Sequence, residues 1–394
     1  MSSPRKVIVA LLLLAVTSVF STASISTNYK YKHKAPRGLS PEAASELRSV
    51  GLDKYLGEFS PVSSTDVGDG WVKHEFDSDG GDGPICIAGT PWSAFTRKGN
   101  PAKLLIFEQG GGACWQNFYF CNILAEQQEA PPADPQGIWD FDSKDNPFRD
   151  YSIVYMPYCD GSVFTGDNDV VDPVFPFGPV RFHRGLRNQS AGMDLAKAIF
   201  PRASKITVAG SSAGGVGVAG NAPFLVRLLY GNQVDLTVFN DAGPVAINLA
   251  EDAAIAARAG DWQFGQFFPA SCTDCDDLGQ GTAIIDWRLT NDSTIREAFY
   301  STDGDSTNRF FLNVPDQEQY RTLLLMEHGA LNAAHPERYK RFIVSGDDSH
   351  TALQTPLFFS QEVNGVPLNE WAKYFVSPRK PFWLDLVDDF EPLP

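Results

Sequence analysis

The sequence predicts an α/β fold built on a mainly parallel sheet. Six short apolar runs indicate buried strands, at 103–107, 151–156, 205–209, 235–239, 297–300 and 341–344. Their apolar residues are consecutive rather than alternating, which is typical of strands that are covered on both faces. Helical patterns at 185–200 and 214–231 lie between these runs. Because strand and helix alternate along the chain, we expect helices on both faces of the sheet.

Two connections, 126–150 and 165–180, are rich in Pro, Asp and Gly and are longer than ordinary loops. Loops of this length usually carry function or cover a site. We therefore expect long loops over the site of a single catalytic domain that spans 69–394. An N-terminal segment, 24–68, is expected to be partly disordered.

The first 23 residues have the pattern of a secretory signal peptide. Arg5 and Lys6 precede an apolar run at 7–16, and small residues at 21–23 form a cleavage pattern. The apolar run is shorter than the roughly 20 residues of a spanning helix. We expect a secreted protein without stable membrane insertion.

The formal net charge is −16 at pH 7. A chain this acidic repels phosphate instead of releasing counterions from it, so nucleic acid and anionic membranes are excluded as expected partners. The sequence leaves the oligomeric state open, with a monomer as the expectation.

Six cysteines, an even number, accompany the export signal, which favours disulfides over metal ligands. Cys272 and Cys275 have the spacing of half a zinc site, but no second pair or nearby histidine completes it. We expect neither a metal nor an organic cofactor.

The run Gly210-Ser211-Ser212-Ala213-Gly214 lies between a predicted strand and a predicted helix, which is the context of a nucleophile elbow. The two glycines allow a sharp turn, so Ser212 would project from the carboxyl end of the strand. The alternative is a glycine-rich turn that packs a helix on a sheet or binds phosphate. The run lacks the lysine and the second spacing of a P-loop.

A serine becomes a strong nucleophile only when a base takes its proton. His350 is the best candidate among six histidines, because it follows the last predicted strand through a short loop. In α/β-hydrolases the base comes last in chain order. His328 and His335 lie in a predicted helix, where solvated or capping roles are expected, and His183 lies among arginines at a helix start.

The acid that orients the base should follow a strand between Ser212 and His350 in the chain. Asp305 meets this condition after the strand at 297–300 and is preferred. The alternatives that stay open are Asp241, Asp303, Asp347 and Asp348.

Acyl transfer also needs donors for the oxyanion. One is normally the amide of the residue after the nucleophile, here Ala213. Gly110, Gly111 and Gly112 follow the strand at 103–107 and are similar to the oxyanion loop of esterases. We expect the amides of Gly111 and Gly112 to be the other donors, and the alternative for this loop is a flexible linker.

Taken together, these motifs resemble the pectin acetylesterase family, which also includes the Notum-type protein deacylases. The resemblance rests on GGGACWQNFYFC, YMPYCDGSVFTG, GSSAGGVG and FNDAGP in the same order, followed by a histidine loop, GDDSHTA; these stretches are 110–121, 155–166, 210–217, 239–244 and 346–352. It implies an α/β-hydrolase fold with the triad Ser212, Asp305 and His350, and with Asp241 as an ordered neighbour. It also implies the disulfides Cys86–Cys159 and Cys114–Cys121, which leave Cys272–Cys275.

The expected function is that of a secreted serine carboxylic-ester hydrolase that removes short acyl groups, acetyl above all, from a cell-wall polysaccharide such as pectin through an acyl-enzyme. Two alternatives stay open: a Notum-like deacylase of longer acyl chains on protein or lipid, and a catalytically silent glycan-binding protein. An anionic polysaccharide would need a local basic patch, and the cluster at 181–187 is the compact candidate. The alternative for that cluster is a solvated helix face.

Overall fold

The computed structural model describes residues 37–77, 81–126, 135–377 and 382–394. The predicted signal peptide at 1–23 and the part of the N-terminal segment before 37 lie outside these residues. The described chain belongs to one compact unit, Pro36–Pro394.

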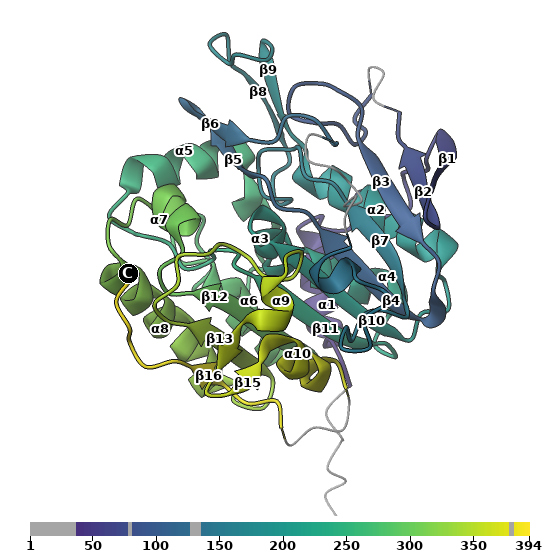
Figure 1. Ribbon diagram of the computed structural model, residues 1–394. Coiled ribbons are helices and arrows are strands. Elements are labelled where there is room, and N and C mark those ends of the chain that lie inside the picture. Colours follow the sequence, from purple (N-terminus) through teal and green to yellow (C-terminus); the bar gives the residue numbers. More distant parts are fainter. Residues whose placement is uncertain (1–36, 78–80, 127–134, 378–381) are drawn as a thin grey trace, which may run out of the picture. The chain divides into compact units, whose positions relative to one another are not determined.

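Ten strands of the described chain form one sheet (Figure 1). In spatial order they are β1 (Ser63–Gly68), β2 (Trp71–Glu75), β3 (Ser93–Arg97), β7 (Tyr151–Met156), β4 (Asn100–Glu108), β10 (Lys205–Ser211), β11 (Asp235–Asp241), β12 (Arg296–Thr302), β13 (Tyr339–Val344) and β16 (Leu386–Val387). All pairs from β7 to β16 are parallel, whereas β1, β2 and β3 extend the sheet with antiparallel pairs. The six predicted strands are therefore all in the parallel part of the sheet, which β16 completes, and this confirms the α/β prediction.

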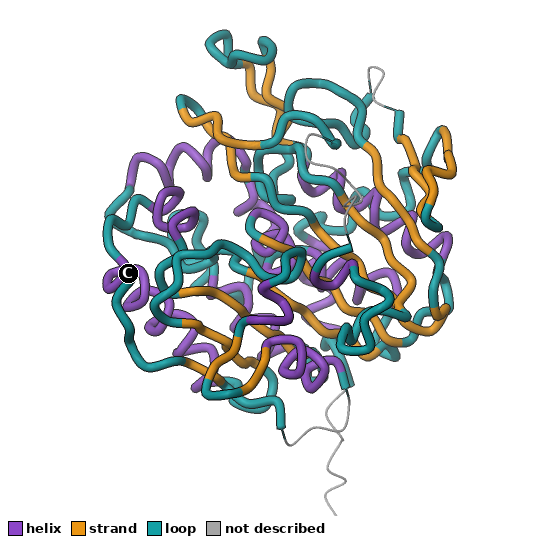
Figure 2. Tube along the Cα trace, viewed as in Figure 1, coloured by secondary structure: helices purple, strands orange, loops and turns teal. Residues whose placement is uncertain are grey.

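Helices cover the sheet on both faces, as the tube trace also shows (Figure 2). They are α1 (Pro41–Ser49), α2 (Gly185–Ile199), α3 (Ala213–Ala219), α4 (Ala222–Tyr230), α5 (Asp252–Trp262), α6 (Thr282–Asn291), α7 (Ser306–Leu312), α8 (Gln317–Ala334), α9 (Leu357–Ser360) and α10 (Leu368–Val376), with 3-10 turns at Gly137–Trp139 and Phe264–Phe267. Three two-stranded sheets pair β5 (Gly112–Trp115) with β6 (Phe118–Cys121), β8 (Asn168–Val171) with β9 (Val180–His183), and β14 (Glu362–Val363) with β15 (Val366–Pro367).

Two apolar cores follow from the alternation of side chains along the central strands. On β4, Leu104 and Ile106 belong to one core, whereas Leu105 and Phe107 belong to the other. Each central strand is thus buried on both faces, which explains why its apolar residues are consecutive in the sequence.

The helix predicted at 214–231 is two helices in the structure, α3 and α4, separated at Gly220 and Asn221. Pro223 lies in the first turn of α4, where its missing N–H is tolerated. In the interior of one continuous helix the same proline would remove a backbone hydrogen bond and clash with the preceding turn.

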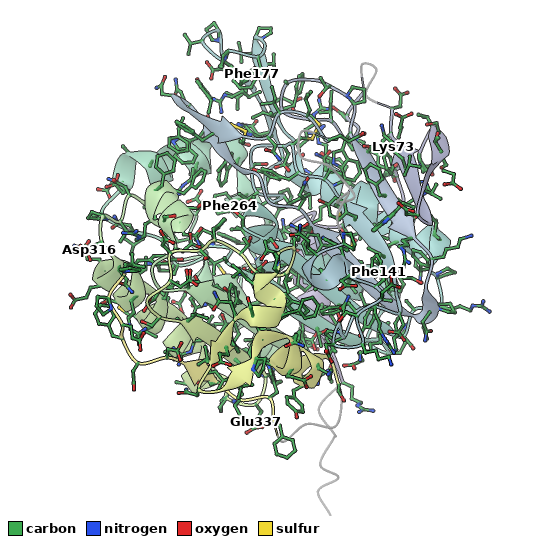
Figure 3. All side chains as sticks on the ribbon, viewed as in Figure 1. Lys73, Phe141, Phe177, Phe264, Asp316 and Glu337 are labelled. Carbon is green, nitrogen blue, oxygen red and sulfur yellow. A yellow bond between two sulfur atoms is a disulfide. The ribbon has the colours of Figure 1, made fainter. Side chains whose placement is uncertain are left out.

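The stretch predicted as a long loop at 165–180 contains β8 and the start of β9, and these strands project from the body as a hairpin (Figure 1). Phe177 lies at the outer end of this projection (Figure 3) and is about half exposed. In the loop at 126–150 the described part contains the turn Gly137–Trp139, whose three residues are buried, so it packs on the domain.

The domain boundary expected at residue 69 is wrong for the described part of the N-terminal segment. Residues 37–68 form α1 and β1, and β1 is the edge strand of the large sheet. Leu47 and Leu52 are fully buried in the first core, and Leu39 pairs with Asp292. The burial of these apolar side chains holds the segment on the domain. Charge and proline content do not reveal such burial. No helix in the described ranges is long and apolar enough to cross a membrane.

Candidate active site

Ser212 lies at the turn between β10 and α3, at the carboxyl end of the central strand. Its backbone has φ 56° and ψ −118°, a conformation that is rare for a residue with a side chain and is typical of strained functional positions. The Ser212 amide donates a hydrogen bond to the Asp241 carbonyl at 2.8 Å, which holds the turn against β11.

Glycine is required on both sides of this turn. A Cβ atom on Gly210 would overlap the carbonyl of Gly214, and a Cβ on Gly214 would overlap the carbonyl of Glu108 at the end of β4. The elbow therefore fits between β4 and α3 only because both positions lack a side chain.

His350 and Asp305 form a hydrogen-bonded pair. The Nδ1 atom of His350 lies 2.7 Å from Oδ2 of Asp305, whose side chain is fully buried. Asp305 also caps α7, since its Oδ1 accepts from the amide of Asn308 at 2.8 Å. When Nδ1 carries the proton, Nε2 of His350 is left as the basic nitrogen, and this atom has no hydrogen-bond partner among the described residues.

The competing aspartates are bound elsewhere. Asp303 accepts hydrogen bonds from Gln317, Arg321 and Ser345, at 2.6 to 2.7 Å. Asp347 accepts from the amide of Ser349 and from Gln361, both at 2.7 Å. Asp348 is exposed, and its side chain forms no hydrogen bond with His350 in the described structure.

Asp241 has a different role beside the site. Its carboxylate accepts from Ser211 Oγ at 2.5 Å and from the amides of Ala352 and Leu353 at 2.9 and 3.0 Å. It therefore joins the elbow to the loop that carries His350, as an ordered neighbour of the site.

The three glycines after β4 lie against the elbow. A Cβ atom on Gly110 would lie 2.8 Å from the Ser211 carbonyl oxygen and 2.9 Å from Cβ of Ser212, so the backbones touch. Gly111 accepts from the Asn122 amide at 2.8 Å, and Gly112 begins β5. Ala213 is the first residue of α3, and the first amides of a helix have no acceptor within the helix.

Two hollows meet at Ser212. One, which we call the histidine cleft, is open and is lined by Gly110–Gly112, Tyr119–Asn122, Ser211, Ser212, Thr307, Phe310, Phe311, His350, Thr351 and Gln354. Phe120 and Phe310 are exposed in this cleft, with ring centroids 5.4 Å apart.

The other hollow, which we call the apolar cavity, has a volume of about 170 Å³ and also reaches Gly112, Ser212 and Ala213. Its remaining wall is mostly apolar and includes Trp115, Val163, Val216, Val245, Ile247, Ile255, Trp262, Phe264, Phe268, Ile284, Phe311 and Leu312. The fold therefore gathers the predicted site residues around Ser212: Gly111, Gly112 and His350 in the histidine cleft, and Gly112 and Ala213 in the apolar cavity.

Two buried carboxyl groups near the elbow were not singled out in the sequence. Glu108, at the end of β4, is fully buried, and burial raises the pKa of its carboxyl well above the usual value; Gln189 donates to its Oε1 at 2.8 Å. Burial raises the pKa of Asp160 to about 6, although hydrogen bonds from Ser162 oppose this shift. Glu108 ends a strand and Asp160 lies in the loop after β7, and many acidic residues share such positions.

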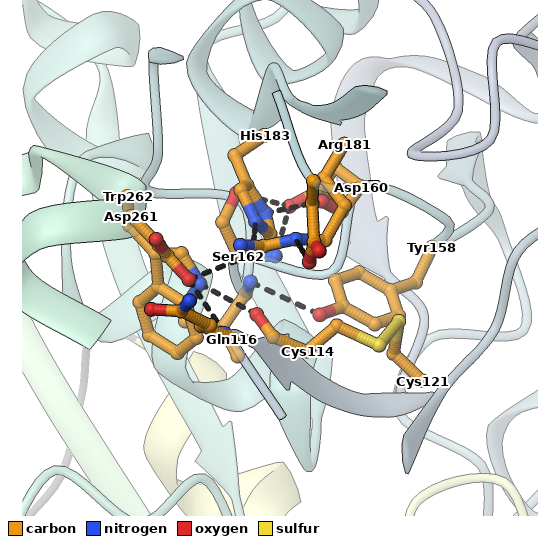
Figure 4. Close-up of a disulfide and its surroundings, with 12 residues drawn as sticks. Cys114, Gln116, Cys121, Tyr158, Asp160, Ser162, Arg181, His183, Asp261 and Trp262 are labelled. Carbon is orange, nitrogen blue, oxygen red and sulfur yellow. Dashed lines mark hydrogen bonds and ion pairs between the residues drawn. A yellow bond between two sulfur atoms is a disulfide. The ribbon is translucent and has the colours of Figure 1, made fainter. Parts of the chain in front are cut away.

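The basic cluster at 181–187 is not a free cationic patch. Arg181 binds Asp172 and Asp261, Arg184 binds Asp169, and Arg187 binds Asp167 (Figure 4 shows Arg181 and Asp261). These arginines are largely buried, so the alternative of a solvated helix face is also wrong. His183 lies among them, and burial lowers its pKa to about 3.

The two histidines in and just after α8 have structural contacts. His328 is buried rather than solvated, stacks on Phe299 with centroids 3.7 Å apart, and has a pKa lowered by burial to about 3. His335 caps the end of α8, as expected, and its Nε2 lies 2.8 Å from Asp286.

All six cysteines are paired, as Cys86–Cys159, Cys114–Cys121 and Cys272–Cys275, which confirms the expected pairing. The second bridge closes the β5–β6 hairpin beside the site, where Trp262 donates to the carbonyl of Cys114 at 2.8 Å (Figure 4). Within the described ranges no group of histidine, cysteine or acidic side chains has the arrangement of a metal site.

Two comparisons with known proteins found matches. Residues 75–250 match the family model described as Pectinacetylesterase. Among solved structures the chain is similar to the Wnt deacylase Notum from Drosophila, with 18% sequence identity and a TM-score of 0.57, over 77% of this chain and 93% of that chain. At this identity the likeness shows the fold, which is that of an α/β-hydrolase. No curated protein sequence matches the chain. Over residues 75–250 the chain is therefore similar to the pectinacetylesterase family.

Proposed function

We propose that the protein is a secreted serine hydrolase of carboxylic esters and that Ser212, His350 and Asp305 are its triad. The observation that carries this proposal is the His350–Asp305 pair, whose free Nε2 shares a cleft with Ser212 at the strained elbow. A serine, a histidine and an orienting carboxylate in this relation are the parts that acyl transfer needs.

In the first half of the proposed reaction, Ser212 Oγ attacks the carbonyl carbon of the ester and His350 Nε2 takes its proton. The amides of Gly111, Gly112 and Ala213 stabilise the negative oxygen that forms. The tetrahedral intermediate collapses, the C–O bond to the alcohol breaks, and His350 returns the proton to the departing alcohol. Asp305 holds the imidazole and stabilises its charged form.

In the second half, water takes the place of the alcohol. His350 takes a proton from the water, the resulting hydroxide attacks the acyl carbonyl, and the bond to Ser212 breaks. The carboxylic acid leaves, and the proton on His350 returns to Ser212 Oγ. No redox step or cofactor enters this scheme.

The two hollows receive the two halves of the ester. Because His350 must protonate the departing alcohol, the alcohol belongs in the histidine cleft, where His350, Thr351 and Gln354 lie. The acyl group then belongs in the apolar cavity, which reaches Ser212, Ala213 and Gly112 but not His350.

The family match supports an acetyl ester of a polysaccharide, such as pectin, as the substrate. The side chains of Arg181, Arg184 and Arg187 are already ion-paired, so this cluster does not offer free positive charge to an anionic polymer. The chain as a whole is acidic and would repel such a polymer. A neutral acetylated glycan therefore fits the charge of the protein better than polygalacturonate does. The three disulfides support an extracellular location.

The apolar cavity supports a second candidate, the deacylation of longer acyl chains on protein or lipid. An acetyl group would leave most of a cavity of about 170 Å³ unfilled, whereas a longer chain would bury its methylene groups against the apolar wall.

Hydrolysis of p-nitrophenyl acetate and p-nitrophenyl octanoate by the wild type and by Ser212→Ala tests these proposals. We expect the wild type to cleave esters and Ser212→Ala to lose at least about a thousandfold in kcat. A higher kcat/KM for acetate would favour the polysaccharide acetylesterase, and a higher value for octanoate would favour the deacylase. An inactive wild type would leave the glycan-binding alternative, and full activity in Ser212→Ala would refute the triad.

A further inference from the structure

A positively charged side chain in the wall of the apolar cavity forms no ion pair with the described residues. Arg258, on α5, lines this cavity together with Ser212. It makes no hydrogen bond or ion pair with the residues that the structure describes. By contrast, Arg181, Arg184 and Arg187 of the cluster at 181–187 are all ion-paired.

The surroundings of Arg258 are mostly apolar. Its guanidinium lies 5.3 Å from the ring centroid of Trp115, which stacks on Phe118 with centroids 4.0 Å apart. Burial lowers the pKa of Arg258, and the charge of Glu251, seven residues earlier in the chain, acts in the opposite direction. An arginine remains charged even so.

Two acidic residues also line the cavity, but neither forms an ion pair with Arg258 in the described structure. Asp276 is exposed, and its Oδ1 accepts from the amide of Leu278 at 3.0 Å. Asp277 is half-buried and lies beside Gly265, in the 3-10 turn Phe264–Phe267 that follows α5. Solvent screens the exposed carboxylate of Asp276, and neither carboxylate lies within ion-pairing distance of the Arg258 guanidinium in the described structure.

A partly buried guanidinium without a counter-ion has lost some of its hydration and gains from an anionic partner. A planar guanidinium matches a carboxylate in shape and can donate two parallel hydrogen bonds to it. Because the same cavity reaches Ser212, such a carboxylate can be part of a substrate whose ester lies at the elbow.

We propose that Arg258 binds a carboxylate carried on the acyl chain of the substrate, so that the enzyme accepts monoesters of dicarboxylic acids. This inference rests on the proposed function, because it needs the acyl group to enter the apolar cavity. An ion pair with Arg258 would let the cavity select acyl chains by charge as well as by length, because an uncharged chain of the same length cannot form it.

The test compares matched substrates on the same protein. The mono-p-nitrophenyl esters of hexanedioic, octanedioic and decanedioic acids are paired with p-nitrophenyl hexanoate, octanoate and decanoate. The quantity measured is the ratio of kcat/KM for the carboxylated ester to that for its uncharged partner. A general loss of activity or of folded protein cancels in this ratio.

We expect a ratio near or above one in the wild type for at least one chain length. Arg258→Met, which keeps an unbranched apolar side chain beside Trp115, should lower that ratio about tenfold or more, as expected for a lost charged hydrogen bond. Arg258→Lys should keep part of the ratio, because it keeps the charge but not the two parallel donors. The exposed Arg202 gives a control, Arg202→Met, which should leave the ratio unchanged.

Two results would overturn the inference: wild-type ratios far below one at every chain length, or a ratio that Arg258→Met does not change. Both leave the proposed function standing, because they require that the uncharged esters are cleaved. If the wild type cleaves no ester at all, the proposed function fails first, and the inference fails with it.

Discussion

Ser212 and His350 are marked by local sequence, whereas the acid of the proposed triad is not. The elbow glycines and the place of His350 after the last predicted strand single out these two residues. Asp303 and Asp305 are two residues apart, and both follow β12. The structure separates them, since Asp303 binds Arg321 and Gln317 whereas Asp305 binds His350.

This separation predicts different effects of two isosteric substitutions. Asp305→Asn should lower kcat by a thousandfold or more, because the amide favours the wrong tautomer of His350, and the order of magnitude follows the corresponding change in other triads. Asp303→Asn should change kcat only a few-fold while lowering stability, because it weakens a buried ion pair with Arg321. Steady-state kinetics and urea unfolding of both variants check this, and equal losses of kcat would contradict the assignment.

At the scale of elements, the site depends on how closely β4, β10 and α3 approach one another. The strand and the helix on either side of Ser212 are visible in the sequence pattern. The break between α3 and α4 and the projection of β8 and β9 depend on backbone contacts that periodicity does not describe. A short helix of small residues such as α3 is stabilised mainly by packing on the sheet rather than by its own propensity.

Gly214→Ala should test the close approach of α3 to β4. The new Cβ would overlap the Glu108 carbonyl, so we expect the free energy of unfolding to fall by about 2 kcal/mol or more, together with a loss of activity.

Gly260→Ala is the matched control. Gly260 lies in α5, is exposed, and has no described heavy atom within 4 Å of the added Cβ. Alanine there should stabilise the protein by up to about 1 kcal/mol. Urea unfolding compares the two variants, and an undiminished stability of Gly214→Ala would mean that the elbow is less tightly packed than described.

At the scale of the whole molecule, the compact unit begins earlier than sequence composition indicates. Residues 37–68 contribute an edge strand and the buried side chains of Leu39, Ala43, Leu47 and Leu52. Lys54 and Tyr55 of this segment also bind Asp167, which is paired with Arg187 on α2.

A chain that begins at residue 69 should therefore be much less stable than one that begins at residue 37. Loss of the burial of these four side chains alone removes on the order of 5 kcal/mol from the free energy of unfolding. Urea unfolding of both chains measures the difference, and coincident transitions would show that the catalytic domain does start at 69.

The sequence by itself determined the α/β class, the six parallel strands, the elbow and the position of the histidine, because each depends on short-range periodicity or on a motif only a few residues long. Only the tertiary structure decided that Asp305 binds His350, that the arginines of 181–187 are ion-paired, that residues 37–68 belong to the domain, and that an apolar cavity lined by Arg258 reaches Ser212. These features join residues that are tens to hundreds of positions apart. Their energies come from burial and from specific partners, which a local pattern does not contain.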